Sequence, residues 1–417
     1  MVSDPAKSSA TIPVRCVKLV LKAALLLALV AVAVAPITLL LNQQNKSHKG
    51  TLDFANFYMA GKIVRQGRSR DLYNLRLQRQ VESEISPGGP FLPYYHPPFE
   101  ALLFAAFTVF PYPRALLVWA GANLLVLVLT FYLLRFSSYR LSTEGYLSWL
   151  AVVIFLTIGV MLLGQDTMLL APIFLLAFLA LKRRRDYAAG LTLGLGLFRF
   201  EILLPFVFIF LVRQRWRLFA GFITTSVAAV LLSVGMVGWN GLVGYAETLA
   251  KVGSSAGRWT TMVDPSTMPS LRGVVGTFLN FLIPGKAVFP VVLLGTLILL
   301  AWAAWEFRSV VKPDGPAFDL EFSLATIAAL LSSYHVFVHE LTPLIAVGYL
   351  ILGYEGTRRR EGLLGNRQGT ALLLIFAAVF GIGGAVFHFR GFSVLFIVLL
   401  GLMVCIAQEL RSLRLPA

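Results

Sequence analysis

The stretch "AAGLTLGLGLFRFEILLPFVFIFLV", residues 188–212, is apolar at both ends and carries an arginine and a glutamate in its middle. Each half is too short to cross about 30 Å of hydrocarbon, and a charge at membrane depth is costly and usually functional. Basic runs flank the stretch at 182–185 and 213–217, and short loops rich in Lys and Arg stay in the cytoplasm. We therefore expect the stretch to enter from inside, turn at 198–201 and return.

Long apolar runs fill much of the remaining chain. Of its 417 residues, 58% are hydrophobic and 13% charged, whereas soluble domains are about 45–50% apolar and about 25% charged. This composition predicts an all-α polytopic membrane protein with about ten transmembrane helices plus re-entrant or interfacial helices. The net charge of +16 reflects basic loops that orient the chain in the membrane. The expected partner is therefore the lipid bilayer, and no nucleic acid is expected. Cys16 and Cys405, near opposite ends, suggest neither a disulfide framework nor a metal site.

A single integral membrane domain over residues 1–417 is predicted. Its first apolar run is too long for a signal-peptide core and is interpreted as an uncleaved anchor. In chain order, the parts are a cytoplasmic leader at 1–18, a first transmembrane helix at 19–41, an outer loop with interfacial helices at 42–97, a core helical bundle at 98–355 and C-terminal helices at 356–417.

Polar residues gather on the outer side of this topology. Crossing parity requires that Pro97 to Phe110, only 14 residues, forms a re-entrant or interfacial helix. The outer side then receives "GQD" at 164–166, "FRFE" at 198–201, "MPSLRG" at 268–273 and all five histidines, His48, His96, His335, His339 and His388. Any chemistry is expected to face outward, on the non-cytoplasmic side of a plasma or inner membrane.

Five motifs carry a resemblance to a known family. They are "DFANFYMAGKIVRQGRSRDLYN" (53–74), "YYHPPFEALLFAAFTVFPYPRA" (94–115), "GQDTMLLAPIFLLAFLALKRRRDYAAGLTLGLGLFRFEILLP" (164–205), "MPSLRG" (268–273) and "SSYHVFVHELTPL" (332–344). In this order they resemble glycosyltransferase family 87, membrane enzymes of the GT-C architecture that use polyprenyl-phosphate sugars, typically mannose, as donors. The chain departs from the family at Arg199–Phe200, where Lys followed by Pro is common.

The resemblance implies a hexosyltransferase, with mannose as the expected sugar, a polyprenyl-phosphate donor and a glycolipid or glycan acceptor. Because the family's donors are β-linked, inversion would give an α-glycoside. The resemblance also implies chemistry without a metal or cofactor, and the chain, which contains no Asp-x-Asp motif, is consistent with this. A transporter or lipid flippase is the alternative, since such proteins also use broken helices with buried charges. An inactive, scaffold-like member of the family is a third possibility.

One carboxylate and a set of cations are the candidate reacting groups, since an inverting transfer needs a base and a charge to stabilise the leaving phosphate. Asp53 is the candidate general base, although Asp is also a common helix N-cap. Arg199 is the first candidate for the donor phosphate; an ion pair with Glu201 or snorkelling is the alternative. Arg272 and His335 are further phosphate candidates, with a surface role or a helix-end role as alternatives.

Other polar side chains are candidates for sugar or acceptor binding. They are Tyr58, His96, Gln165, Asp166 and His339. The alternative for Tyr58 is the interfacial aromatic belt, and for Gln165 and Asp166 it is a cap of the next helix. His335 and His339 would share one face of a helix, but no third zinc ligand accompanies them.

Three glycines resemble a nucleotide-binding loop only superficially. Gly190, Gly194 and Gly196 follow no predicted strand, so close packing between helices explains them better.

Overall fold

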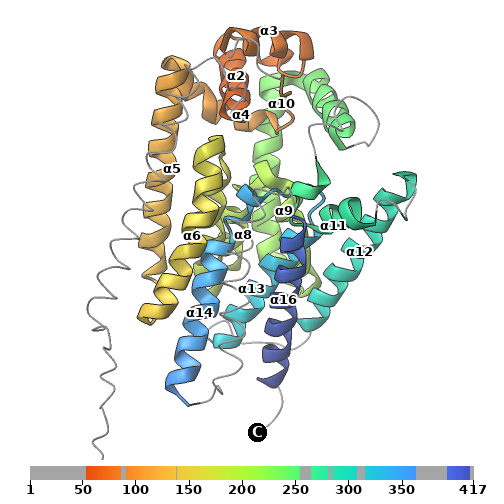
Figure 1. Ribbon diagram of the computed structural model, residues 1–417. Coiled ribbons are helices and arrows are strands. Elements are labelled where there is room, and N and C mark those ends of the chain that lie inside the picture. Colours follow the sequence, from red (N-terminus) through yellow and green to blue (C-terminus); the bar gives the residue numbers. More distant parts are fainter. Residues whose placement is uncertain are drawn as a thin grey trace, which may run out of the picture.

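The computed structural model describes residues 53–85, 91–137, 139–253, 264–279, 282, 285–307, 315–362 and 392–413. In this part of the chain all regular elements are helices, which confirms the all-α class (Figure 1). The first transmembrane helix expected at 19–41 lies outside the described residues.

The described α-helices have the following bounds in chain order. They are α2 (Asp53–Arg65), α3 (Leu75–Ile85), α4 (Pro98–Ala105), α5 (Tyr112–Leu134), α6 (Thr143–Leu163), α7 (Leu170–Lys182), α8 (Asp186–Gly194), α9 (Phe200–Val212), α10 (Trp216–Gly253), α11 (Leu271–Phe278), α12 (Gly285–Glu306), α13 (Pro316–Ser332), α14 (Leu344–Arg360) and α16 (Val394–Ser412). Short 3₁₀ turns are η1 (Ser69–Asp71), η2 (Ala106–Val109), η3 (Thr167–Leu169), η4 (Leu197–Arg199), η6 (Pro265–Thr267) and η7 (Val338–Leu341).

Five of these helices are long and apolar enough to cross a membrane. The candidate spans are Tyr112–Leu134, Gly145–Leu163, Trp216–Lys251, Ala287–Glu306 and Val394–Ser412. A sixth results if the bent pair α8 and α9 counts as one span. The described residues therefore do not confirm the predicted number of about ten.

Helices α2, α3 and α4 form a cap at one end of the bundle (Figure 1). Helix α2 lies directly on α4, since a Cβ at Gly61 would stand 2.6 Å from the backbone carbon of Phe104. Helix α10 bends at Gly238, whose φ is 70°, and the Met236 carbonyl accepts a hydrogen bond of 2.7 Å from Ser69. The segment Pro97 to Phe110 forms α4 and η2 within this cap, as expected for a helix that does not span.

Ion pairs join the basic loops at the opposite end of the bundle. Lys182 lies 2.8 Å from Asp319 at the start of α13, and Arg213 lies 3.7 Å from Glu321. Arg411 pairs there with Glu306, the last residue of α12. Loops that the sequence predicts to be cytoplasmic thus share one end of the molecule, away from the cap.

Helices α8 and α9 make the hairpin expected from the opening stretch. The chain bends by 68° at the break between them, and Arg215, just after α9, lies 3.0 Å from Asp186 at the start of α8. Because this ion pair holds the start of α8 next to the end of α9, the geometry favours a re-entrant hairpin over a broken span. The hairpin lies on α10, where a Cβ at Gly190 would stand 1.9 Å from the Leu218 oxygen. This confirms close helix packing as the reason for that glycine.

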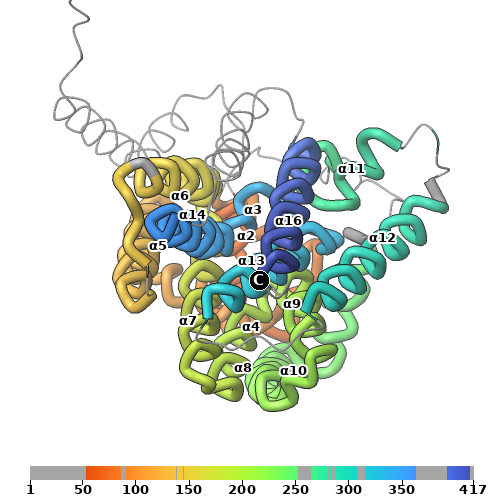
Figure 2. The backbone as a smooth tube through the Cα atoms, turned by 90° about the horizontal axis from the view of Figure 1, so that it is seen from below, coloured from red at the N-terminus to blue at the C-terminus, as the bar shows by residue number. Residues whose placement is uncertain are grey.

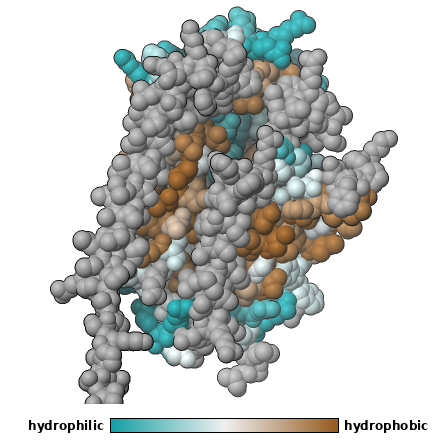
Figure 3. Space-filling view, in the orientation of Figure 1, coloured by the Kyte–Doolittle hydropathy of each residue, from teal (hydrophilic) through white to brown (hydrophobic). Residues whose placement is uncertain are grey.

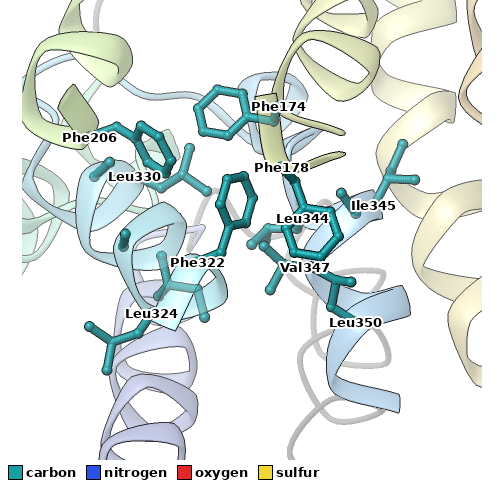
Figure 4. Close-up of a cluster of buried hydrophobic side chains, with 14 of the residues drawn as sticks. Phe174, Phe178, Phe206, Phe322, Leu324, Leu330, Leu344, Ile345, Val347 and Leu350 are labelled. Atoms are coloured by element: carbon teal, nitrogen blue, oxygen red, sulfur yellow. The ribbon is translucent and has the colours of Figure 1, made fainter. Parts of the chain in front are cut away.

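Aromatic side chains fill the bundle below the hairpin's tip. Figure 2 shows α13 near the centre of the bundle, and every residue from Phe318 to Ser332 is buried. The ring of Phe322 lies 5.1 Å from that of Phe178 and 5.4 Å from that of Phe206 (Figure 4). Figure 3 shows an apolar band between two hydrophilic ends. This packed core fixes the hairpin against the central helix.

Candidate active site

A tight turn between α6 and α7 presents the first two polar groups of the site. Gly164 ends α6 with φ of 68°, and a Cβ there would stand 2.6 Å from the Cβ of Phe54. Trp119 donates a hydrogen bond of 3.0 Å to the Gly164 carbonyl, and Asn123 donates one of 3.1 Å to the Gln165 carbonyl. The turn is therefore fixed against both α2 and α5.

Asp53 begins α2 and faces this turn. The amide Nε2 of Gln165 donates a hydrogen bond of 2.6 Å to the Asp53 carboxylate. Burial raises the pKa of Asp53 to about 6, although the Gln165 hydrogen bond and the Arg199 charge act in the opposite direction. A carboxylate with this pKa is mostly ionised at neutral pH and is still basic enough to accept a proton.

Arg199 lies at the tip of the hairpin with only 2% of its surface exposed. Its guanidinium contacts the carboxylates of Asp166 at 2.5 Å and Glu340 at 3.0 Å. It also donates to the Gln165 side-chain oxygen at 3.3 Å and contacts His96 Nδ1 at 2.6 Å. An internal ion pair is thus present, but these partners replace Glu201, the partner considered from the sequence.

His96 must accept the hydrogen bond from Arg199, because a guanidinium can only donate. The imidazole is therefore neutral, and burial followed by the Arg199 charge holds its pKa well below the ordinary value. The Glu100 carboxylate lies 3.5 Å from the same ring nitrogen. His96 Nδ1 consequently lies close to both the Arg199 guanidinium and the Glu100 carboxyl group.

Glu100 and Glu340 belong to this cluster although sequence reasoning did not select them. Glu100 is 3% exposed and Glu340 is 5% exposed, so both carboxyl groups are withdrawn from solvent. With Asp166 they place three acidic side chains around one guanidinium. Buried charges need partners, and this rule could have flagged Glu100 after the Pro-Pro pair and Glu340 beside His339.

A second cluster surrounds Arg272 in the first turn of α11. Its guanidinium contacts His335 Nε2 at 2.7 Å and lies 4.2 Å from the centre of the Tyr334 ring. Within the described residues no carboxylate pairs with Arg272, which is 8% exposed. Burial and the Arg272 charge lower the pKa of His335 to about 3, so this ring is neutral.

The hydroxyl group of Ser270 lies at the start of the same short helix. It is fully buried and has no hydrogen-bond partner among the described residues, and it does not cap α11. A helix N-terminus, a buried hydroxyl group and an arginine together can bind an anion. The second cluster is therefore suited to a phosphate.

The remaining candidates lie beside the two clusters. His335 and His339 do not share a helix, because α13 ends at Ser332 and the turn η7 begins only at Val338. The His339 ring stacks on Phe337 at 5.6 Å, and burial, then the Arg199 charge, lowers its pKa to about 3. No group of three metal-ligating side chains occurs in the described ranges.

Tyr58 and Asp166 have protein partners of their own. The Tyr58 hydroxyl group donates a hydrogen bond of 2.8 Å to the Phe110 carbonyl, inside the cap. The Asp166 side chain does not cap η3 and faces Arg199 instead. The capping alternative for Asp166 is therefore wrong.

Comparison with known proteins identifies the family. The model of glycosyltransferase family 87 matches residues 94–333, more than half of the chain, and this region includes Arg199 and Arg272. No curated protein and no solved structure matches the chain. The chain belongs to glycosyltransferase family 87 and is a membrane glycosyltransferase.

Proposed function

We propose that the protein transfers a hexose, expected to be mannose, from a polyprenyl phosphate to a hydroxyl group of a glycolipid or glycan, with Asp53 as general base. The observation that carries this proposal is the Asp53 carboxylate at the start of α2, which accepts a hydrogen bond of 2.6 Å from Gln165. Its pKa of about 6 suits a base that works at neutral pH.

The reaction is a single inverting displacement. The acceptor hydroxyl group gives its proton to Asp53 while its oxygen attacks the anomeric carbon of the sugar. The bond between that carbon and the phosphate oxygen breaks, and the polyprenyl phosphate leaves with its negative charge. A β-linked donor then gives an α-glycoside.

Arg272 and His335 are the groups proposed to stabilise the leaving phosphate. Arg272 is a buried cation with no carboxylate partner in the described part of the chain, and the hydroxyl group of Ser270, two residues earlier in the sequence, is unpaired there. Arg199 is less suited to this role, since its guanidinium is already paired with the Asp166 carboxylate and also contacts Glu340. His339, beside the Arg199 cluster, remains a proposed contact for the sugar.

The protein has an apolar surface close to the second cluster, and we propose that the prenyl chain of the donor lies on it. The ring of Phe289 on α12 lies 5.7 Å from that of Tyr334, which covers Arg272. Below it α12 exposes a run of apolar side chains to the surroundings: Phe289, Leu293, Leu294, Leu297 and Ile298. Figure 3 shows apolar surface on this side of the molecule. A donor that moves laterally in the bilayer could therefore place its tail on α12 and its phosphate near Arg272.

The non-cytoplasmic side is proposed for the reaction. The basic loops at 182–185 and 213–217 lie at the end opposite the cap, and such loops remain in the cytoplasm. Asp53 and its neighbours then face the outer aqueous phase.

Asp53→Asn tests the proposal. The purified protein is incubated with labelled polyprenyl-phosphate mannose and a membrane lipid extract, and the glycosylated product is followed by mass. Loss of a general base reduces turnover by about 10²- to 10⁴-fold, while the thermal unfolding of the variant in detergent stays close to that of the wild type.

Asp71→Asn is the matched control, because Asp71 is an exposed acidic residue of the same cap. It should retain the wild-type rate. Asp53→Asn turnover within about tenfold of the wild type would contradict the assignment of the base. Transport of the labelled donor across vesicles without a new glycosidic bond would instead favour a flippase.

A further inference from the structure

We propose that Gln165 is a positioning residue for Asp53 and that Arg199 fixes the orientation of the Gln165 side-chain amide. This inference rests on the proposed role of Asp53 as the base. The two ends of the Gln165 amide bind in opposite directions. Its Nε2 donates to Asp53 at 2.6 Å, and its Oε1 accepts from Arg199 at 3.3 Å.

Arg199 determines which end of the amide faces Asp53. A guanidinium has donors only, so the Gln165 oxygen must point toward Arg199 and the NH₂ group toward the carboxylate. If the amide were flipped, its oxygen would face the carboxylate and its NH₂ group would face the guanidinium, and neither pair could form a hydrogen bond. Arg199, at the tip of the hairpin of α8 and α9, thus determines that the Gln165 NH₂ group donates to Asp53.

The position of Arg199 is itself fixed by groups from separate segments. His96 precedes α4, Asp166 lies in the turn after α6, and Glu340 lies in η7. Glu340 is held in turn by the Phe337 backbone amide, which donates to its second oxygen at 2.7 Å. Because groups from separate segments fix the Arg199 side chain, it is not free to move with a substrate. This favours a positioning role for Arg199 over a substrate-binding role.

The arrangement has a consequence for the base. One oxygen of Asp53 is engaged by Gln165, which leaves the other for the acceptor hydroxyl group. A hydrogen bond to the ionised form stabilises that form and opposes the effect of burial on the pKa of Asp53. Without Gln165 the carboxylate would therefore take up a proton at higher pH and would also rotate more freely.

Gln165→Glu and Gln165→Ala test the inference in the transferase assay over pH 5 to 9. Loss of a hydrogen bond to a charged group is expected to lower kcat at pH 7 by about 10- to 100-fold. The acid limb of the pH–rate profile should move to higher pH by about one to two units, because the ionised base has lost its donor. The KM for the donor should change by less than about twofold, since uniform substrate binding is untouched.

Asn123→Ala is the matched control. It removes the hydrogen bond to the Gln165 carbonyl and so loosens the same turn without altering the contact with Asp53. Thermal unfolding of this variant in detergent should show a loss of stability, while the acid limb should remain in the wild-type position.

Each result decides between roles. A Gln165→Glu variant with the wild-type kcat and acid limb overturns the inference. A raised KM without a pH shift also overturns it, since Gln165 would then bind sugar. If Asp53→Asn, measured in the same assay, retains activity, the proposed function fails instead, so the two failures are distinguishable.

Discussion

The protein contains two buried arginines near its proposed active site, and their surroundings differ. Arg199 lies among acidic side chains and contacts the carboxylates of Asp166 and Glu340. Arg272 contacts a neutral histidine and an aromatic ring, with no paired carboxylate in the described residues. The first guanidinium is paired with carboxylates of the protein, whereas the second has none in the described residues, as its proposed role toward the donor phosphate requires.

The difference shows that the partners of a buried charge indicate its role better than its burial does. A cation enclosed by carboxylates is expensive to disturb, because removal of one partner leaves the others buried and unpaired. A cation without such partners contributes little to folding and can stabilise charge that develops in a reaction. The predictions below test this division.

The largest effect is expected for Arg199→Met. It leaves Asp166 and Glu340 buried without a cation, which should reduce the free energy of unfolding by about 3–5 kcal/mol. Chemical denaturation in detergent micelles, followed by tryptophan fluorescence, measures this loss.

Neutralising the two acids in the same protein provides the control. The triple variant Arg199→Met, Asp166→Asn and Glu340→Gln should regain much of the lost stability, because no charge remains unpaired. An Arg199→Met variant as stable as the wild type would show that the carboxylates are not held in their ionised form by this arginine.

A smaller effect, confined to turnover, is expected for Arg272→Gln. Removal of one group that stabilises developing charge lowers kcat by about 10²- to 10³-fold. The stability should change little, since no carboxylate in the described ranges loses a partner. Single-turnover kinetics with labelled donor separates this chemical step from product release.

Arg272→Lys sharpens the same test. It retains the positive charge but not the planar fork that grips a phosphate, so an intermediate rate is expected. Equal rates for the Arg272→Gln variant and the wild type would show that Arg272 does not stabilise the leaving phosphate. The Arg199 cluster would then be the remaining candidate site for the phosphate.

The smallest effect is expected for Tyr58→Phe, which belongs to neither cluster. Its hydroxyl group donates only to the Phe110 carbonyl, so its loss should cost about 0.5–1.5 kcal/mol of stability. Turnover at saturating donor should be unchanged. A large rise in KM would instead show that Tyr58 contacts the sugar.

Much of the fold was accessible from the sequence because charge and apolar length act locally. The basic runs at 182–185 and 213–217 predicted a hairpin, and the structure joins its ends through Asp186 and Arg215. The 14-residue segment from Pro97 to Phe110 was predicted not to span, and it forms part of the cap. The number of spans was less accessible, since five to six rather than about ten helices qualify in the described part.

The pairings within the site could not be predicted in the same way. Arg199 contacts His96 and Glu340, which lie more than a hundred residues before and after it in the sequence. No local sequence pattern predicts contacts between residues so far apart. The shared face of His335 and His339 depended on a helix, but α13 ends at Ser332. Tertiary packing decides these contacts, and the sequence offered only the residue types.

The glycine contact between α8 and α10 carries a constraint on how this enzyme can diversify. Gly190 leaves no space for even one methyl group against the Leu218 oxygen, and Arg199 stands at the far end of the same rigid hairpin. A substitution at that buried contact is expected to displace the arginine and, through it, Gln165, the residue proposed to align the base. Lineages that acquire new acceptors should therefore vary the cap and preserve this contact.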